Sequence, residues 1–349
     1  MRKSDIKTTT YRTNYTLIDG LKVFFYAIIL PIIVSIALTL VFTLVSALMD
    51  IPYDKFLNSR FVAYVNIVAM GIAYLILYFV FNKKNKIKNF SSCGLKNKPD
   101  VIYLILSIVA GVGCVFVFEP ITSLILGGLE KIGFNVMGDL PYVMDTWQRI
   151  ILGIIGYALL PAIAEELVFR GVVQKAFGSR CTAFCTIFFS TFCFVIMHGS
   201  LQQFIYQIVL GVVLASFYYF TKNILYSFIF HFVNNLTVVI MSLIGMPKYM
   251  ENGFFYISDF MGYFMPILLC VLGIGLIVLL VWFLSIRYRR QTKGQEMVVE
   301  GDNIIIEEEN KKLGLRVFTS KISLNEKYYF VLGMASAIII WIFNTFGYF

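Results

Sequence analysis

Nine long apolar runs divide the 349-residue chain and leave little sequence between them. They cover residues 21–49, 61–82, 101–127, 149–171, 182–198, 201–221, 223–245, 259–286 and 328–347. About 20 residues of helix cross the hydrocarbon of a bilayer, because each residue rises ~1.5 Å. One run, 182–198, is short for a crossing, so we expect eight or nine spans. The pattern predicts an all-α, polytopic transmembrane helix bundle.

Composition excludes the other broad classes of protein. Hydrophobic residues make up 59% of the chain and charged residues only 14%. A soluble domain is about 25% charged and roughly 45–50% apolar. A disordered chain has few apolar residues and much charge. We therefore expect a multi-pass integral protein of the cell membrane, with the lipid bilayer as a partner and no binding of nucleic acid.

Lysine and arginine placement predicts the orientation of the bundle. If the N-terminus is cytoplasmic, the inner segments hold 22 basic residues and the outer segments hold 5. Cytoplasmic loops of membrane proteins carry this excess of positive charge. The sequence therefore favours a cytoplasmic N-terminus, with basic cytoplasmic segments that include 83–100 and 287–327.

Ionisable side chains within the apolar runs are few, and most of them lie between residues 149 and 245. A charge at bilayer depth costs at least ~2.5–3.5 kcal/mol, so each needs a reason to be there. Glu166 and Arg170 are four residues apart with the acid first, the favourable order for an ion pair on a helix. Glu165 points about 100° away from Glu166 and lacks that partner. Pro161 opens the helix one turn before both acids, because proline has no N–H to donate.

The two histidines of the chain follow in the next spans. Phe194 and His198 are four residues apart on one helix face, and so are His231 and Asn235. Unpaired imidazole, amide and carboxylate groups are costly in hydrocarbon. We therefore expect Glu165, His198, His231 and Asn235 to form one polar cluster.

Such a cluster can do several things. It can hold helices together as a buried polar network. It can hydrolyse a bond, with a carboxylate and an imidazole activating water and with imidazole or amide groups stabilising an oxyanion. A third possibility is a divalent metal, because Glu165, His198 and His231 are a workable set of zinc ligands. A proton-coupled transporter also uses such residues, but no paired broken helices in two matching halves are apparent.

Three motifs carry a resemblance to a known family. EExxxR at Glu165–Arg170, FxxxH at Phe194–His198 and HxxxN at His231–Asn235 resemble, in order and spacing, the motifs of the CPBP family. This family, also called Abi, contains type II CAAX prenyl endopeptidases, bacteriocin-processing and immunity proteins, and related intramembrane proteases. The resemblance covers roughly residues 100–245. Glu119, followed by Pro120 in the third span, is not part of the pattern.

The resemblance implies an intramembrane endopeptidase that hydrolyses a peptide bond in a peptide or membrane-associated protein. Glu165 would activate water with His198, and His231 and Asn235 would complete the site. Glu166, Arg170 and Phe194 would support it. The family is named for metalloproteases, which implies Zn²⁺ on Glu165, His198 and His231, although a metal-free glutamate mechanism is the alternative. A further alternative is a non-catalytic scaffold or bacteriocin immunity protein that binds and stabilises a partner.

This interpretation divides the chain into three regions. Residues 1–100 supply N-terminal spans and a basic cytoplasmic loop. Residues 101–245 form the CPBP-like catalytic helical core. Residues 246–349 supply C-terminal spans and a charged cytoplasmic loop at 287–327.

Overall fold

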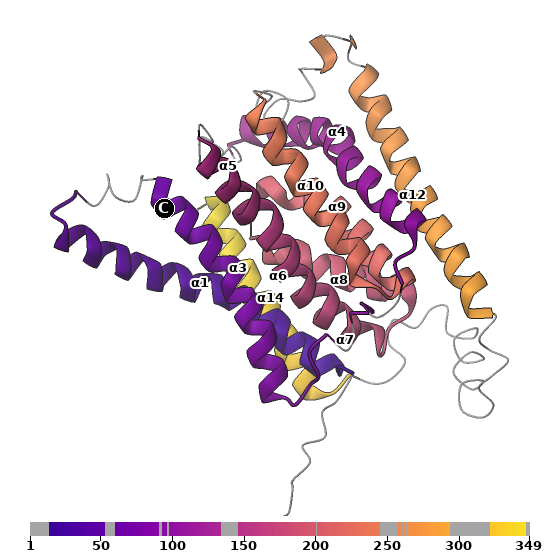
Figure 1. The fold of residues 1–349 in the computed structure, drawn as a ribbon, viewed down its shortest axis with the longest axis horizontal. Coiled ribbons are helices and arrows are strands. Elements are labelled where there is room, and N and C mark those ends of the chain that lie inside the picture. The colour runs from indigo at the N-terminus through magenta and orange to yellow at the C-terminus, as the bar shows by residue number, and fades with distance from the viewer. Residues whose placement is uncertain are drawn as a thin grey trace, which may run out of the picture.

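The computed structural model is a bundle of helices, and it contains no extended strand in the residues that it describes (Figure 1). These residues are 14–52, 60–90, 93–95, 98–133, 146–199, 201–244, 257–259, 261–262, 264–293 and 322–346. The helices are α1 (Leu17–Leu48), α3 (Arg60–Lys84), α4 (Val101–Lys131), α5 (Trp147–Gly153), η1 (Ile154–Leu159), α6 (Leu160–Val168), η2 (Phe169–Gln174), α7 (Lys175–Gly178), α8 (Ala183–Met197), α9 (Leu201–Thr221), α10 (Ile224–Leu243), α12 (Phe264–Lys293) and α14 (Leu324–Phe346).

The prediction of an all-α polytopic membrane protein is confirmed. Each of the nine apolar runs corresponds to a helix, with α5 through α7 forming one continuous rod. Among the described residues, seven helices are long and apolar enough to span a membrane. That set leaves out α8, which has 15 residues, and α14. The chain is therefore a multi-pass integral membrane protein.

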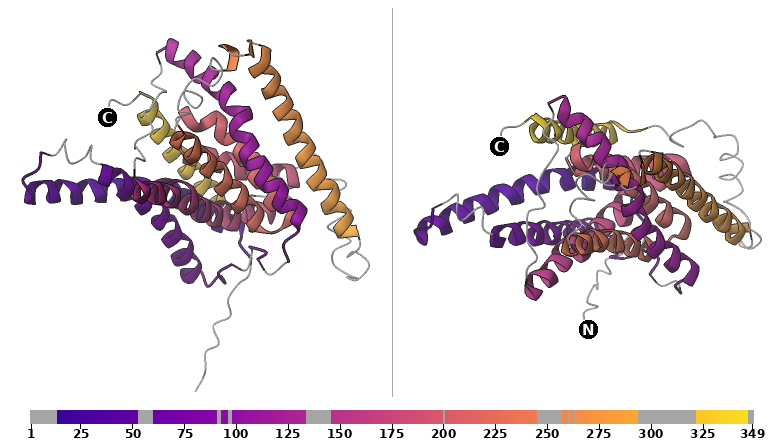
Figure 2. Two further views of the ribbon diagram at one scale, coloured as in Figure 1. Left: turned by 45° about the horizontal axis from the view of Figure 1, so that its top comes forward. Right: turned by 90° about the horizontal axis from the view of Figure 1, so that it is seen from above.

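Helix α1 packs on the bundle only along its first half. Thr16 and Asp19 form a capping box in which each side chain accepts a hydrogen bond from the other's backbone N–H. Gly20 lets α7 approach closely, because a Cβ there would lie 2.4 Å from the Cβ of Ala176. Beyond Pro31 the helix extends away from the other helices (Figure 2). Most large side chains of this outer half, such as Ile36, Leu40 and Leu44, are apolar and exposed, which suits contact with lipid.

Helix ends that the charge pattern assigns to the cytoplasmic side meet in ion pairs. Asp100 caps the start of α4 and pairs with Arg287 near the end of α12. Arg180, between α7 and α8, pairs with Glu326 at the start of α14 at 3.0 Å. Each ion pair joins two helix ends that the sequence assigns to the same, cytoplasmic side of the membrane. Most of the charged loop predicted at 287–327 lies outside the described residues.

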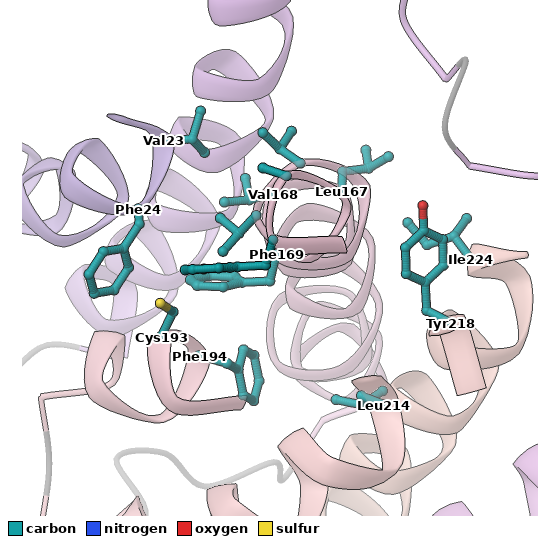
Figure 3. Close-up of a cluster of buried hydrophobic side chains, with 14 of the residues drawn as sticks. Val23, Phe24, Leu167, Val168, Phe169, Cys193, Phe194, Leu214, Tyr218 and Ile224 are labelled. Atoms are coloured by element: carbon teal, nitrogen blue, oxygen red, sulfur yellow. The ribbon is translucent and has the colours of Figure 1, made fainter. Parts of the chain in front are cut away.

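The largest cluster of buried apolar side chains surrounds the rod formed by α6 and η2. Phe169 of this rod lies between Phe24 of α1 and Phe194 of α8 (Figure 3). The rings of Phe169 and Phe194 meet edge to face, with centroids 5.4 Å apart. The rod is thus held from several sides, which fixes the direction of the polar side chains that it carries.

All six cysteines are free thiols, and four of them are buried. Cys181 lies between α7 and α8, outside the spanning helices, and burial raises the pKa of its thiol to about 12. The thiol is therefore neutral at ordinary pH and acts as a small apolar group.

Helices α4 and α10 cross at a glycine. A Cβ on Gly111 would lie 2.9 Å from the carbonyl oxygen of Phe230 and 3.1 Å from the side chain of Val233. The Gly111 carbonyl also accepts a hydrogen bond from Asn234 at 3.1 Å. The absence of a side chain at Gly111 therefore sets the distance between α4 and the segment that carries His231.

We expect Gly111→Val to destabilise the folded protein by about 1–3 kcal/mol, because the new side chain forces α4 away from α10. Gly113→Val is the matched control, since a Cβ there meets no atom within 4 Å. Thermal unfolding of both purified variants in detergent measures the difference. Equal losses of stability in the two variants would contradict a close α4–α10 contact.

Candidate active site

Two π-helical turns flank the glutamate pair. The π segment η1 ends immediately before α6, whose second residue is Pro161, and η2 begins three residues after Glu166. Proline cannot donate a backbone hydrogen bond, which explains why the regular ladder is interrupted there. A π turn adds a residue and rotates the helix that follows it, and such turns are common at functional sites. Here the short segment between them presents Glu165 and Glu166 to different neighbours.

Glu166 and Arg170 form the ion pair that their spacing predicts. Arg170 Nη1 donates to Glu166 Oε1 at 2.9 Å, and the side chains are 0% and 1% exposed. The guanidinium carbon also lies 4.3 Å from the ring centroid of Phe194. A cation over an aromatic face is stabilised by the negative face of the ring. Two full charges are therefore held inside the bundle, each with a partner.

His231 lies between the two glutamates. Its Nδ1 is 3.0 Å from Glu166 Oε1, and its Nε2 is 4.0 Å from Glu165 Oε2. Glu166 Oε1 also accepts from Arg170 Nη1, and a carboxylate oxygen can only accept a hydrogen bond. The hydrogen of neutral His231 is therefore on Nδ1, and the lone pair of Nε2 faces Glu165. The 4.0 Å gap is longer than a direct hydrogen bond, so this pair can share a water molecule.

His198 reaches the same place from the end of α8. It caps this helix, its Nδ1 lies 2.8 Å from the carbonyl oxygen of Phe194, and its ring packs edge to face on Phe194 with centroids 4.8 Å apart. Because a carbonyl accepts, Nδ1 carries the hydrogen and Nε2 keeps a lone pair. His231 packs on the same Phe194 ring at 6.1 Å. Phe194 therefore supports both imidazoles.

Two residues that the sequence did not single out hold the end of α8. The Tyr74 hydroxyl lies 3.1 Å from the carbonyl oxygen of Ala27 and 3.0 Å from the sulfur of Met197. The indole N–H of Trp341 in α14 donates to the carbonyl of Ile196 at 3.1 Å. Both contacts lie next to His198 in sequence. In the sequence, Tyr74 and Trp341 differ from their apolar neighbours only by the polar hydroxyl and indole N–H groups at the ends of their side chains.

The structure separates the two neighbouring asparagines of α10. Asn235, from the predicted cluster, is half-buried one turn beyond His231, and it makes no hydrogen bond within the described residues. Asn234 is 1% exposed and its Nδ2 donates to the Gly111 carbonyl and to the Tyr206 hydroxyl, the latter at 2.7 Å. Asn234 thus ties α10 to α4 and α9, a structural contact that sequence reasoning missed. The amide of Asn235 remains available.

A cavity of about 200 Å³ lies between α3 and α6 and reaches Glu165. Its lining is almost entirely apolar, and it is formed by Asn66, Ile67, Met70, Gly71, Tyr74, Pro161 and Glu165. The Glu165 carboxylate is therefore partly accessible, whereas Glu166 is sealed in the bundle. Glu165 is therefore the accessible acid of the pair, and Glu166 is the buried one.

The predicted zinc ligands do not form a metal site in this arrangement. Among the described residues, no group of three histidine, cysteine, aspartate or glutamate side chains is placed to hold a metal ion. Glu165 and His231 approach each other, but His198 does not complete a set of ligands with them. The zinc assignment therefore stays a prediction.

Comparison with known proteins identifies relatives of this site. Residues 147–237 match the family model of the Rce1-like type II CAAX prenyl endopeptidases, a range that contains all three motifs. The "Putative membrane peptidase YdiL" of Bacillus subtilis (strain 168) is 29% identical over 110 residues, which are 32% of this chain and 45% of that protein. The "Membrane-embedded CAAX protease MroQ" of Staphylococcus aureus (strain USA300) is 24% identical over 208 residues, 58% of this chain and 83% of that protein.

The chain thus spans less than half the length of the first of these relatives and most of the second. No solved structure matches it. The resemblance to the CPBP family is confirmed by the family model and by both relatives.

The buried ion pair can be tested by removing one charge or both. We expect Arg170→Met to destabilise the protein by about 3–5 kcal/mol, because Glu166 is left without a counter-charge in the bundle. The double variant, Glu166→Gln with Arg170→Met, removes both charges and should recover much of that loss. Thermal unfolding in detergent compares the two. A double variant no more stable than Arg170→Met would show that the two charges are not coupled.

Proposed function

We propose that this protein is an intramembrane endopeptidase that hydrolyses a peptide bond in a peptide or membrane-associated protein. The observation that carries the proposal is His231, held between a buried glutamate that orients it and an accessible glutamate beside a cavity. The resemblance to the CPBP family supports this reaction class, and the two relatives are named as a putative peptidase and a protease.

The first step is the activation of water at Glu165. A water molecule between Glu165 Oε2 and His231 Nε2 would donate one hydrogen bond to each, since both atoms are acceptors. As the water oxygen attacks the scissile carbonyl carbon, one of these acceptors takes the proton. The Nε2 lone pair of His198, whose ring packs on Phe194 as that of His231 does, is a second acceptor. The proton then passes to the leaving amine as the C–N bond breaks.

The developing oxyanion needs a hydrogen-bond donor, and Asn235 is the candidate. Neutral His231 and His198 present lone pairs to the site, so neither donates from Nε2 until it has accepted a proton. Asn235 is one turn from His231, and its amide has no other partner within the described residues. A donor of this kind contributes about 10²–10³-fold to the rate in other hydrolases.

Glu166 and Arg170 would support the reaction without touching the substrate. Glu166 would fix the tautomer and direction of His231, and Arg170 would hold the Glu166 carboxylate in place. Phe194 holds the ring planes of both histidines. This is the logic of other hydrolytic sites, in which one acid orients the imidazole and a different group handles water.

Loss of the Glu165 carboxylate should abolish cleavage. We expect Glu165→Gln to lower kcat/KM by about 10²–10⁴-fold, because the amide cannot accept the proton of water. Glu119→Gln is the matched control, since Glu119 is the other half-buried carboxyl within a described span and lies outside the motifs. The assay is cleavage of a quenched-fluorescent library of apolar peptides by the purified protein in liposomes.

Undiminished cleavage by Glu165→Gln would contradict this mechanism. A wild-type protein that cleaves nothing, while both variants fold and insert, would instead favour a non-catalytic scaffold or immunity protein that stabilises a partner.

Chelation tests the metal. With Glu165 and the histidines acting directly on water, we expect cleavage to persist when the protein is incubated with 1,10-phenanthroline. Loss of cleavage that added Zn²⁺ restores would assign a zinc ion to the site and overturn the metal-free scheme. The non-chelating isomer 1,7-phenanthroline, applied at equal concentration, controls for hydrophobic inhibition.

A further inference from the structure

Helix α3 runs alongside the rod of α5, η1 and α6 with a constant register. A Cβ on Gly156 would lie 3.2 Å from Ile67, and a Cβ on Gly71 would lie 2.3 Å from Leu160. The two contacts are separated by the same number of residues on both helices. The helices are therefore parallel neighbours along this stretch, and the cavity between them follows their axes.

Asn66 and Glu165 lie at opposite ends of this cavity. The register puts Asn66 level with Ile155, about ten residues from Glu165, which corresponds to roughly 10–15 Å along the axis. An extended peptide advances about 3.3 Å per residue. The distance thus matches three to four residues of a peptide whose scissile bond is at Glu165.

The polar groups of the lining sit only at these two ends. The Tyr74 hydroxyl is occupied by the Ala27 carbonyl and the Met197 sulfur, and Pro161 has no backbone N–H. Ile67, Met70 and Gly71 supply an apolar middle. Asn66 makes no hydrogen bond within the described part of the chain. An amide beside an apolar cavity is costly without a partner, and no other described residue of the lining supplies one.

An extended substrate needs hydrogen-bond partners for its backbone. Its backbone N–H and C=O groups lose water when they enter an apolar cavity, and each group left without a partner costs roughly 1–3 kcal/mol. The Asn66 side chain offers an N–H₂ donor and a C=O acceptor, which together satisfy one peptide unit. The described residues that line the cavity include no basic group and one acid, Glu165. Charged side chains on the bound residues would therefore be excluded.

We propose that Asn66 binds the main chain of an extended, uncharged apolar segment of the substrate, three to four residues from the bond that Glu165 cleaves. This inference rests on the proposed function and adds the substrate class: peptides or membrane segments with no charge in those positions. Asn66 touches the substrate but takes no part in the proton transfers.

Binding is tested apart from cleavage in the Glu165→Gln background. A bromoacetyl group is placed on an apolar peptide, four residues from its central bond, and the peptide is added to protein in liposomes. We expect alkylation of Asn66→Cys and none of Thr43→Cys, a control on the outer part of α1. Mass spectrometry separates these products from labelling of the native cysteines. Equal labelling of positions 66 and 43, or none at either, would overturn the inference.

Kinetics with the peptide library supply the second measurement. We expect Asn66→Leu to raise KM about 10-fold with kcat nearly unchanged, and Asn66→Gln to recover part of the loss because it restores an amide. Thr43→Val should match the wild type. Unchanged KM in Asn66→Leu, with Glu165→Gln inactive, would overturn the role of Asn66 and leave the proposed function standing. Labelling of position 66 in the Glu165→Gln background, together with a wild-type protein that cleaves no peptide, would do the reverse.

Substrate charge gives a third readout. Lysine or glutamate introduced three residues from the cleaved bond, on the side of the cavity, should reduce cleavage at least 10-fold. The same substitution on the opposite side is the control. Equal tolerance on both sides would contradict an uncharged binding segment.

Discussion

The buried pair of Glu166 and Arg170 is the interaction on which the rest of the site depends. Either charge alone would be prohibitively costly inside an apolar bundle, so each is present only because the other is. As a carboxylate, Glu166 determines which nitrogen of His231 carries the hydrogen. The Arg170 guanidinium lies over the ring of Phe194. Phe194 in turn supports His198. Three helices are thereby oriented by one pair of charges.

Sequence alone predicted much of this arrangement, for a physical reason. Charge is so costly in a membrane that the rare ionisable residues of the spans can be identified one by one, and helical spacing predicts the Glu166–Arg170 contact. The helical bundle follows from the apolar runs. Contacts between helices could not be predicted in the same way. Tyr74, Trp341 and Asn234 use polar atoms across helices far apart in sequence, and no spacing rule relates them.

The π turns are the other feature that a regular helix template misses. With ideal geometry, the residues before Pro161 and after Val168 would continue a single α-helical ladder. The two widened turns instead rotate the short α6 segment relative to the helix on either side. Within α6, Glu165 borders the cavity while Glu166 contacts His231 of α10. The roles of Glu165, His198, His231 and Asn235 as catalytic groups remain predictions that the substitutions can test.

The brevity of α8 has a consequence for the surrounding bilayer. Its 15 residues rise about 22 Å, roughly 8 Å less than the hydrocarbon of a typical bilayer, and Phe184 and Phe188 on its outer face are exposed. Local thinning of the membrane is one of the ways in which such hydrophobic mismatch is relieved. Lipid beside α8 would therefore be compressed, and water would stand closer to His198 than the thickness of the membrane suggests. A thinner membrane beside α8 would thus shorten the path by which water reaches a hydrolytic site inside the bilayer.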